Sequence, residues 1–289
     1  MIDDLLRKIE EAIKGFFADS LIGTLEKMTG DINDTVLNIG VEVAKGPQEW
    51  NGEVFSLIET LSDTVILPLA GILITYVLVY ELYQMVVENN NMKSFEVSDM
   101  MKYLIKACLA VFILSHTFEI AMAIFDVAGH AVQSAVTEIT DSTSITLGDY
   151  SDIRNALMDM PLSEVVAMWA ESVLIGLIVN AVSIVIMVLL YGRMLEAYLY
   201  ISVAPLPFAA FGNKELSSIS HNYAKGLISV AFQGFFIMVV VGIYAKLIQT
   251  IGDSADLHAT LFNVAICTLV LLFVLLKTGA IAKSIFSAN

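Results

Sequence analysis

Few residues in this chain have the type and spacing that chemistry requires. His116 and Glu119 are three residues apart, so on a helix they place an imidazole and a carboxylate on neighbouring positions of one face. Such a pair could hold part of a metal site or move a proton. A zinc site needs three or four ligands, however, and the chain has no His-Glu-x-x-His or Cys-x-x-Cys motif to supply the others. The sequence therefore predicts no metal and no cofactor.

The motifs of common catalytic sites are also missing. No Gly-x-Ser-x-Gly turn, Walker loop or Gly-x-Gly-x-x-Gly turn occurs, so serine nucleophile chemistry and ATP hydrolysis have no visible basis. The two cysteines, Cys108 and Cys267, stand inside apolar runs, which argues against a disulfide scaffold. We expect a protein that is not an enzyme and that draws any energy it uses from elsewhere.

Ionisable residues inside apolar stretches are the remaining candidates, because burying an unpaired charge in a bilayer is costly. Glu81, His116 and Glu119 stand in such stretches. One interpretation is that Glu81 and Glu119 line a seam that faces protein or water. The alternative is that they are merely paired across helices.

Composition places these residues in a membrane protein. Hydrophobic residues make up 57% of the 289, above the about 45 to 50% of soluble globular proteins, and only 16% are charged. The formal net charge is −15, from 30 acidic and 15 basic residues. A uniformly basic nucleic-acid binder is therefore excluded.

A helix that crosses the hydrocarbon core needs about 20 mostly apolar residues. Five segments meet this length and predict an all-α, polytopic membrane fold. They are residues 65–87, 104–125, 172–191, 227–245 and 259–276.

A sixth apolar segment, residues 197–211, is too short to cross comfortably. Pro205 and Pro207 remove two backbone donors and disfavour helix at the residue before each of them. The segment is predicted to be a proline-broken interfacial or re-entrant hairpin packed against protein.

The positions of basic residues test the predicted number of spans, because short cytoplasmic loops are enriched in lysine and arginine. Beyond the N-terminal region, five spans put only Arg154 in the loops of one face, with Lys246 at the end of a span, and eight basic residues on the other face. The eight are Lys93, Lys102, Lys106, Arg193, Lys214, Lys225, Lys277 and Lys283. A sixth span would move the acidic turn with Asp253 and Asp256 inside. We therefore expect an outer N-terminus and a cytoplasmic C-terminus.

The polar parts flank these spans. Residues 1–63 form a predicted extracytoplasmic helical preface, residues 64–289 the membrane domain, and residues 127–164 a partly helical outer loop. The preface begins with apolar residues at helical spacing, which predicts an amphipathic helix. Those residues are Ile2, Leu5, Leu6, Ile9, Ile13, Phe16 and Phe17. This helix could lie on the membrane surface or pack against a partner helix. After a break at Gly46-Pro47, a second periodic stretch runs into the first span.

Several pieces together resemble one family. The stretch Tyr191-Gly-Arg193-Met-Leu-Glu196 through Pro205-Leu-Pro207, followed by Asn213-Lys-Glu215, resembles the signature region of TrbL-like polytopic subunits of conjugative type IV secretion systems, in the branch on Gram-positive elements. Weaker matches follow it along nearly the whole chain: Pro47-Gln-Glu-Trp50-Asn51, His116-Thr-Phe118, Phe232-Gln-Gly-Phe-Phe236 and Lys277-Thr-Gly279.

The resemblance implies a non-enzymatic channel or scaffold subunit in the bacterial cell membrane. Such a subunit assists the passage of relaxase-bound single-stranded DNA and contacts membrane lipids. Its implied partners are a bitopic bridging subunit, secretion and coupling ATPases, and further copies of itself. Arg193, Glu196, Pro205 and Pro207 would be its motif residues at the inner boundary.

Two other functions remain open. A secondary transporter could build a mid-membrane site from the proline-broken segment with Glu81 or Glu119, although no matching broken segment occurs in the other half of the chain. A holin-like pore-forming protein is the other alternative.

Overall fold

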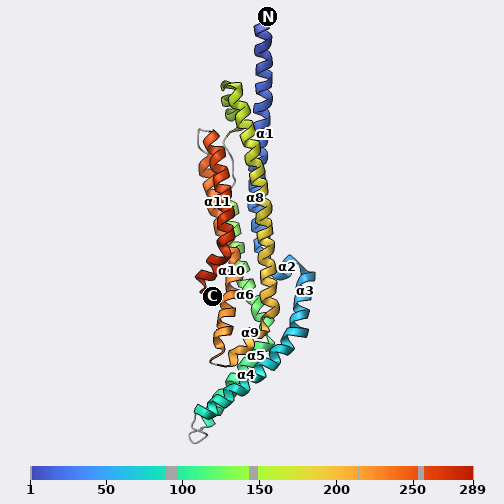
Figure 1. Ribbon diagram of the computed structural model, residues 1–289, viewed down its shortest axis with the longest axis vertical. Coiled ribbons are helices and arrows are strands. Elements are labelled where there is room, and N and C mark those ends of the chain that lie inside the picture. The colour runs from blue at the N-terminus through green and yellow to red at the C-terminus, as the bar shows by residue number, and fades with distance from the viewer. Residues whose placement is uncertain (1, 89–96, 143–148, 214, 253–256, 289) are drawn as a thin grey trace. The chain divides into compact units, whose positions relative to one another are not determined.

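The computed structural model describes residues 2–88, 97–142, 149–213, 215–252 and 257–288 (Figure 1). Lys93, Lys214, Asp253 and Asp256, which entered the count of loop charges, lie outside the described residues. The described part is all helical, which confirms the predicted fold class. Its helices are α1 (Ile2–Ala44), α2 (Pro47–Trp50), α3 (Gly52–Leu61), the π-helix η1 (Ser62–Ile66), α4 (Leu67–Glu88), α5 (Val97–Ser115), α6 (Thr117–Ser142), α7 (Tyr150–Asp159), α8 (Leu162–Val203), α9 (Pro205–Ala209), the 3-10 helix η2 (Ala210–Gly212), α10 (Ser217–Gly252) and α11 (Leu257–Ile285).

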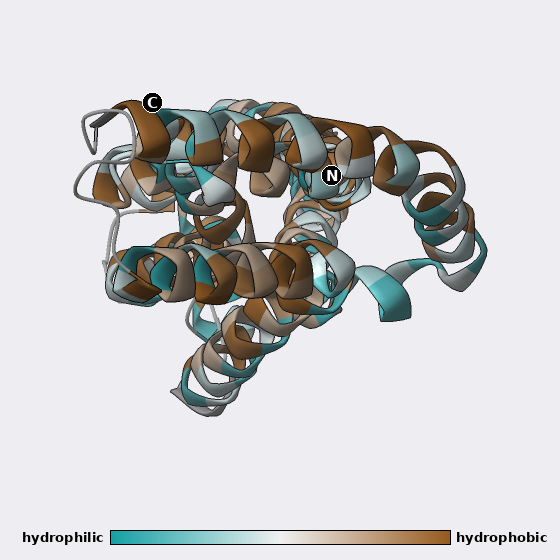
Figure 2. Cartoon of the chain, turned by 90° about the horizontal axis from the view of Figure 1, so that it is seen from below, coloured by the Kyte–Doolittle hydropathy of each residue, from teal (hydrophilic) through white to brown (hydrophobic). Residues whose placement is uncertain are grey.

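Within the described residues, five helical stretches are long and apolar enough to cross a membrane, as predicted. They are Gly52–Val87, Thr117–Ile139, Leu162–Gly212, Ser217–Ile251 and Leu257–Ile285. Figure 2 shows the long apolar runs of these helices broken by polar turns. The protein is therefore a multi-pass membrane protein.

The second predicted span, residues 104–125, is wrong because the chain turns inside it. α5 ends at Ser115, His116 forms a turn, and α6 begins at Thr117. The Thr117 hydroxyl donates to the carbonyls of Ile113 and Leu114, both at 2.9 Å, so it satisfies acceptors at the end of α5. The turn could not be predicted from hydrophobicity, because the segments on both sides of it are apolar. The candidate span in this region is Thr117–Ile139 instead.

The predicted hairpin at residues 197–211 needs a similar correction. α8 continues through residues 197–203, and the chain turns at Ala204 before α9 starts at Pro205. The break before the prolines is therefore confirmed, but the segment is not a hairpin. Pro205 and Pro207 lie in the first turn of α9, where backbone N–H groups have no helical acceptor and their loss costs nothing.

The chain divides into two compact units, which we describe separately. Unit 1 comprises Met1–Val43, Gln133–Leu190 and Ile237–Lys277. Unit 2 comprises Ala44–Val132, Tyr191–Phe236 and Thr278–Asn289.

In unit 1, α1 and α8 each bury an apolar stripe with spacings of three or four residues, interrupted on α8 by the buried Ser172 between Met168 and Ile175. This spacing keeps a stripe on one side of a helix and is the pattern of helices packed side by side at a shallow angle. On α1 the buried apolar residues are Ala18, Leu21, Leu25, Met28, Ile32, Val36, Ile39 and Val43. On α8 they are Val165, Met168, Ile175, Val179, Val182, Ile186 and Leu190.

The contacts between these two helices advance in the same direction, so α1 and α8 run parallel (Figure 1). Trp169 Nε1 donates to Ser20 Oγ at 2.9 Å, and further along the hydroxyls of Thr35 and Ser183 are 3.0 Å apart. The two alternatives for the predicted amphipathic helix of residues 2–17, the membrane surface and a partner helix, stay predictions, because the stripe that packs on α8 begins only at Ala18. The apolar residues from Ile2 to Phe16 stay exposed.

α7 is tied to α1 by polar contacts. Asp149 caps α7 by accepting from Ser151 N at 2.8 Å, and the Ser151 hydroxyl and N–H together hold the pKa of Asp149 below its ordinary value. Arg154 Nε donates to Asp19 Oδ1 at 2.7 Å, and this hydrogen bond raises the pKa of Arg154. Residues 150–159 of the predicted outer loop are thus helical, whereas its residues 127–139 belong to the candidate span Thr117–Ile139.

Unit 2 begins where the sequence predicts a break. Pro47 occupies the first turn of α2, and Asn51 caps α3 by accepting from the backbone N–H of Glu53 and Val54. The Tyr198 hydroxyl donates to Pro47 O at 2.7 Å, and the rings of Trp50 and Tyr191 meet edge to face at 5.4 Å. These contacts fix the α2 segment against the stretch of α8 around Tyr191 and Tyr198.

Two apolar clusters hold the helices of unit 2 together. The first joins α6, α8 and α10, and the second joins α4, α5 and α9. The members of the first are Ala121, Phe125, Ala128, Ala197, Ile201, Leu227, Val230 and Ala231. Those of the second are Ala70, Ile74, Ala110, Leu114 and Ala209.

The α1 stripe yields a stability prediction. Leu25 is fully buried, so Leu25→Ala should lower the free energy of unfolding in detergent by about 2–5 kcal/mol. Leu37 is 46% exposed on the same helix, and Leu37→Ala should change it by no more than about 0.5 kcal/mol. The two effects can be compared by thermal unfolding of the purified proteins. Equal effects would contradict the packing of α1 through this stripe.

Candidate functional site

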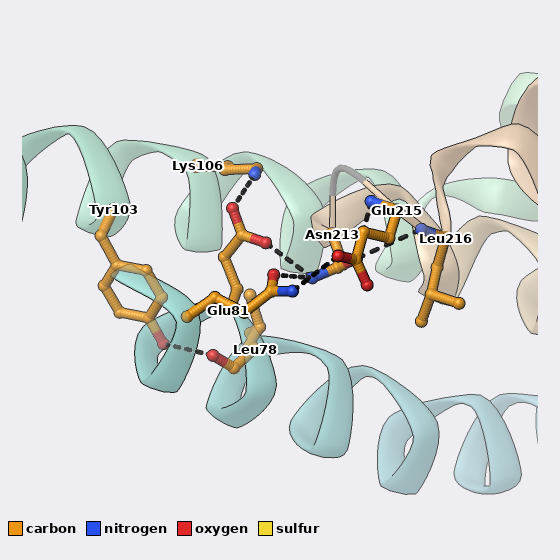
Figure 3. Close-up of polar contacts among 8 residues, drawn as sticks. Leu78, Glu81, Tyr103, Lys106, Asn213, Glu215 and Leu216 are labelled. Atoms are coloured by element: carbon orange, nitrogen blue, oxygen red, sulfur yellow. Dashed lines mark hydrogen bonds and ion pairs between the residues drawn. The ribbon is translucent and has the colours of Figure 1, made fainter. Parts of the chain in front are cut away.

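A polar network joins α4, α5 and the segment that follows η2 (Figure 3). Asn213 is fully buried and lies at its centre. Its Nδ2 donates to Glu81 Oε2 at 2.7 Å and to Gln84 Oε1 at 3.2 Å, both on α4. One amide therefore holds two polar side chains one turn apart on the same helix.

The other half of the Asn213 amide shapes its own segment. Its Oδ1 accepts from the backbone N–H of Glu215 at 2.9 Å and of Leu216 at 3.2 Å, which is an Asx turn. The Glu215 carboxylate in turn accepts from Gln84 Nε2 at 2.9 Å and from the Tyr80 hydroxyl at 3.4 Å. The turn that leads into α10 is thus fastened to α4 by side-chain contacts.

Glu81 completes the network by pairing with Lys106 of α5. The glutamate side chain is only 18% exposed, and the lysine side chain is 40% exposed. A second contact, from the Tyr103 hydroxyl to Leu78 O at 3.2 Å, joins the same two helices. α4 and α5 lie side by side and run antiparallel (Figure 1), and Ala70 and Ile74 of α4 share an apolar cluster with Ala110 and Leu114 of α5.

This arrangement fits a structural clamp better than a catalytic centre. Each carboxylate is engaged by an amide, a hydroxyl or an ammonium group, and the network contains no nucleophile with an adjacent base. Of the two sequence alternatives for Glu81, pairing across helices is the one observed. The described residues contain no group of three or more His, Cys, Asp or Glu side chains that could hold a metal ion.

The other two polar candidates lie at the turn between α5 and α6. His116 Nδ1 is 3.0 Å from Phe112 O, and its Nε2 is 4.0 Å from Glu119 Oε2. The Glu119 side chain is 75% exposed, so it lines no seam within the chain. The structure does not bring His116 or Glu119 to the Asn213 network by any described contact.

The motif residues of α8 are used for packing in unit 2. Arg193 is 7% exposed, and its Nη2 lies 3.5 Å from Ala231 O on α10. Glu196 pairs with Lys283 of α11 at 3.0 Å. After the turn, Ser220 Oγ donates to Pro207 O at 2.6 Å, which fastens α10 to α9. Each of these contacts joins α8 or α9 to a later helix.

Sequence reasoning missed the role of Asn213 and the partner of Glu81. The sequence suggests that Lys106 lies near the end of a span and extends its ammonium group to water. No local pattern indicates that its partner, Glu81, lies 25 residues earlier. The Asn-x-Glu spacing at Asn213 does carry a signal, since asparagine often bonds the backbone two residues on.

A second polar feature lies on α1 in unit 1. Between Gly23 and Val43, the side away from the buried stripe carries Glu26, Lys27 and Asp34, all exposed. Insertion scales assign roughly 2.5 to 3.5 kcal/mol to a charged residue at mid-bilayer. This face is therefore unsuited to contact with lipid.

The comparisons with known proteins gave one match. A family model described as TrbL/VirB6 plasmid conjugal transfer like protein matches residues 32–205, which is more than half of the chain. No curated protein and no solved structure matches.

The network predicts that Asn213 matters more than a surface asparagine. Asn213→Ala would remove two hydrogen bonds from α4 and leave buried polar groups unsatisfied, so it should cost about 1–3 kcal/mol or more. The matched control is Asn155→Ala on α7, which is exposed and should be nearly neutral. Thermal unfolding of both variants in detergent measures the difference, and a neutral Asn213→Ala would contradict the clamp.

Proposed function

Because the chain belongs to the family of TrbL/VirB6 plasmid conjugal transfer-like proteins, we propose that it is a channel or scaffold subunit of a conjugative type IV secretion apparatus. In this role it assists the passage of relaxase-bound single-stranded DNA across the bacterial cell membrane. The observation that carries the proposal is the family match over residues 32–205, on a chain with five helices able to span a membrane.

The proposed subunit is not an enzyme. The ionisable residues of the Asn213 network are paired with one another and hold helices together, which is what a scaffold requires. Separate secretion and coupling ATPases would supply the energy, and a bitopic subunit would bridge to the rest of the apparatus. Several copies of this chain would surround or flank the path of the substrate.

The proposed orientation has the N-terminus outside and the C-terminus in the cytoplasm. Its support is the distribution of lysine and arginine, which gathers at one end of the spans. Arg193, Glu196, Pro205 and Pro207 then lie at the inner boundary, where Lys283 pairs with Glu196.

The acidic outer regions set a condition on this function. DNA phosphates and the outer carboxylates repel each other, so DNA would pass where partners or water separate it from them. The exposed ion pairs Arg154–Asp19, Arg7–Glu11 and Lys8–Asp4 neutralise only part of the acidic excess, since the chain has a formal net charge of −15.

Deletion of the gene from its own conjugative element tests the function. We expect transfer from the deletion donor to fall below detection and to return when the wild-type gene is supplied in the donor. A donor that carries Glu119→Gln, at an exposed carboxylate without a role in the clamp, should transfer normally.

Normal transfer from the deletion donor would contradict the proposal. Dye leakage or solute uptake on expression of the chain alone would favour a holin-like pore or a secondary transporter instead.

A further inference from the structure

We propose that α1 crosses the membrane beside α8 and that its charged face lines an aqueous conduit enclosed by several copies of the chain. The inference rests on the proposed function for the conduit, but the crossing itself rests on packing alone. It replaces the expectation that residues 1–63 all lie outside.

The depth of α1 follows from its partners in unit 1. α8 has no ionisable residue between Glu171 and Arg193, a length of about 30 Å in a helix, so this stretch is the part that spans. Ser183 lies near its middle and its hydroxyl is 3.0 Å from that of Thr35. Thr35 is therefore at mid-membrane depth.

The position of α11 independently assigns the same membrane depth to Thr35. Thr268 lies midway along the apolar stretch 259–276, and its hydroxyl is 3.0 Å from that of Tyr244 on α10. Thr35, Ser183, Tyr244 and Thr268 line one small cavity in unit 1. The middles of two apolar helices thus meet the same turn of α1.

The residues that follow α1 belong to unit 2, and their contacts lie within that unit. α1 ends at Ala44, and three residues later Pro47 accepts a hydrogen bond from Tyr198, while Trp50 packs on Tyr191. Tyr191 and Tyr198 flank Arg193, which the loop charges assign to the cytoplasmic boundary. Residues 46–51 therefore lie at the inner boundary, and α1 must have crossed before them.

The α4–α5 hairpin keeps the rest of the topology consistent. Because α4 and α5 are antiparallel and paired through Glu81 and Lys106, they return the chain to the side from which it came. α6 then starts inside, whether or not the hairpin enters the bilayer. The orientations of α6, α8, α10 and α11 stay as the loop charges require.

The outward faces of the two paired helices differ at the same depth. α8 exposes Leu177, Ile184 and Val188, each more than 60%, which suits lipid. α1 exposes the charged side chains of Glu26, Lys27 and Asp34, and nearer its C-terminal end it also exposes Leu37 and Val41. Charged residues at membrane depth face water or protein rather than lipid, so α1 faces inward in an assembly of several copies.

The length of α1 that is level with the apolar part of α8 carries four acids and one lysine. The acids are Glu26, Asp31, Asp34 and Glu42, and the lysine is Lys27. The conduit wall is therefore hydrophilic and mildly acidic, so it would not retain an anionic polymer.

Cysteine accessibility tests the crossing. The full chain, with Cys108→Ser and Cys267→Ser, is expressed from its own conjugative element, and normal DNA transfer shows that each variant is folded. The cell wall is then removed, and a membrane-impermeant thiol reagent is added to the intact cells. We expect Gln48→Cys to be labelled only after permeabilisation, like Ser218→Cys after η2. Labelling of Gln48→Cys in sealed cells would overturn the crossing.

Two positions at one depth test the conduit. Asp34→Cys should react with a small hydrophilic thiol reagent, because its thiol is in water, and the reaction should block transfer. Ile184→Cys, on the outward face of α8, should react only after the membrane is dissolved. Equal protection of both would overturn the conduit, and Asn38→Cys, also exposed on α1, replaces Asp34→Cys if that variant does not transfer.

These outcomes are separable from the proposed function. If Gln48→Cys is labelled from outside while deletion of the gene abolishes transfer, the inference fails and the function stands. If deletion leaves transfer normal, the function fails whatever the labelling shows.

Discussion

The parallel packing of α1 on α8 is the interaction on which the arrangement of unit 1 depends. Two long stripes with three- and four-residue spacing meet along most of α1, and polar pairs at Ser20 and Thr35 fix their register. The packing has a physical consequence. A helix with an apolar stripe on one side and charges on the other satisfies both sides only where one partner is protein and the other is water.

The remaining charges of the described chain follow the same constraint. Glu81 meets Lys106, Glu196 meets Lys283, and buried Asn213 uses both ends of its amide. The contacts of Glu196 with Lys283 and of Asn213 with Glu81 connect segments of unit 2 that are distant in the sequence, and the pair Glu81–Lys106 connects two consecutive helices. The stretch from Tyr191 to Glu215 thus contributes helix junctions to unit 2, which agrees with the scaffold role proposed above.

Sequence reasoning recovered what depends on local composition. The fold class, the number of spans and the breaks at Gly46-Pro47 and before Pro205 follow from apolar length and proline chemistry. It failed where a distant contact decides. The turn at His116 lies in an unbroken apolar run, and the partner stripe of α1 lies about 150 residues further along the chain. For Glu81 the sequence left two alternatives open, a seam that faces protein or water and pairing across helices, and only the structure places Lys106 beside it.

Disulfide trapping of α1 on α8 in living cells tests the central claim most directly. With Cys108 and Cys267 replaced by serine, Thr35→Cys and Ser183→Cys should form an intramolecular disulfide under mild oxidant in transfer-competent membranes, since the native hydroxyls are 3.0 Å apart. Ser20→Cys with Ser183→Cys should not, because parallel packing separates these positions by about four helical turns. A disulfide in the second pair and none in the first would contradict the parallel packing and the membrane depth assigned to α1.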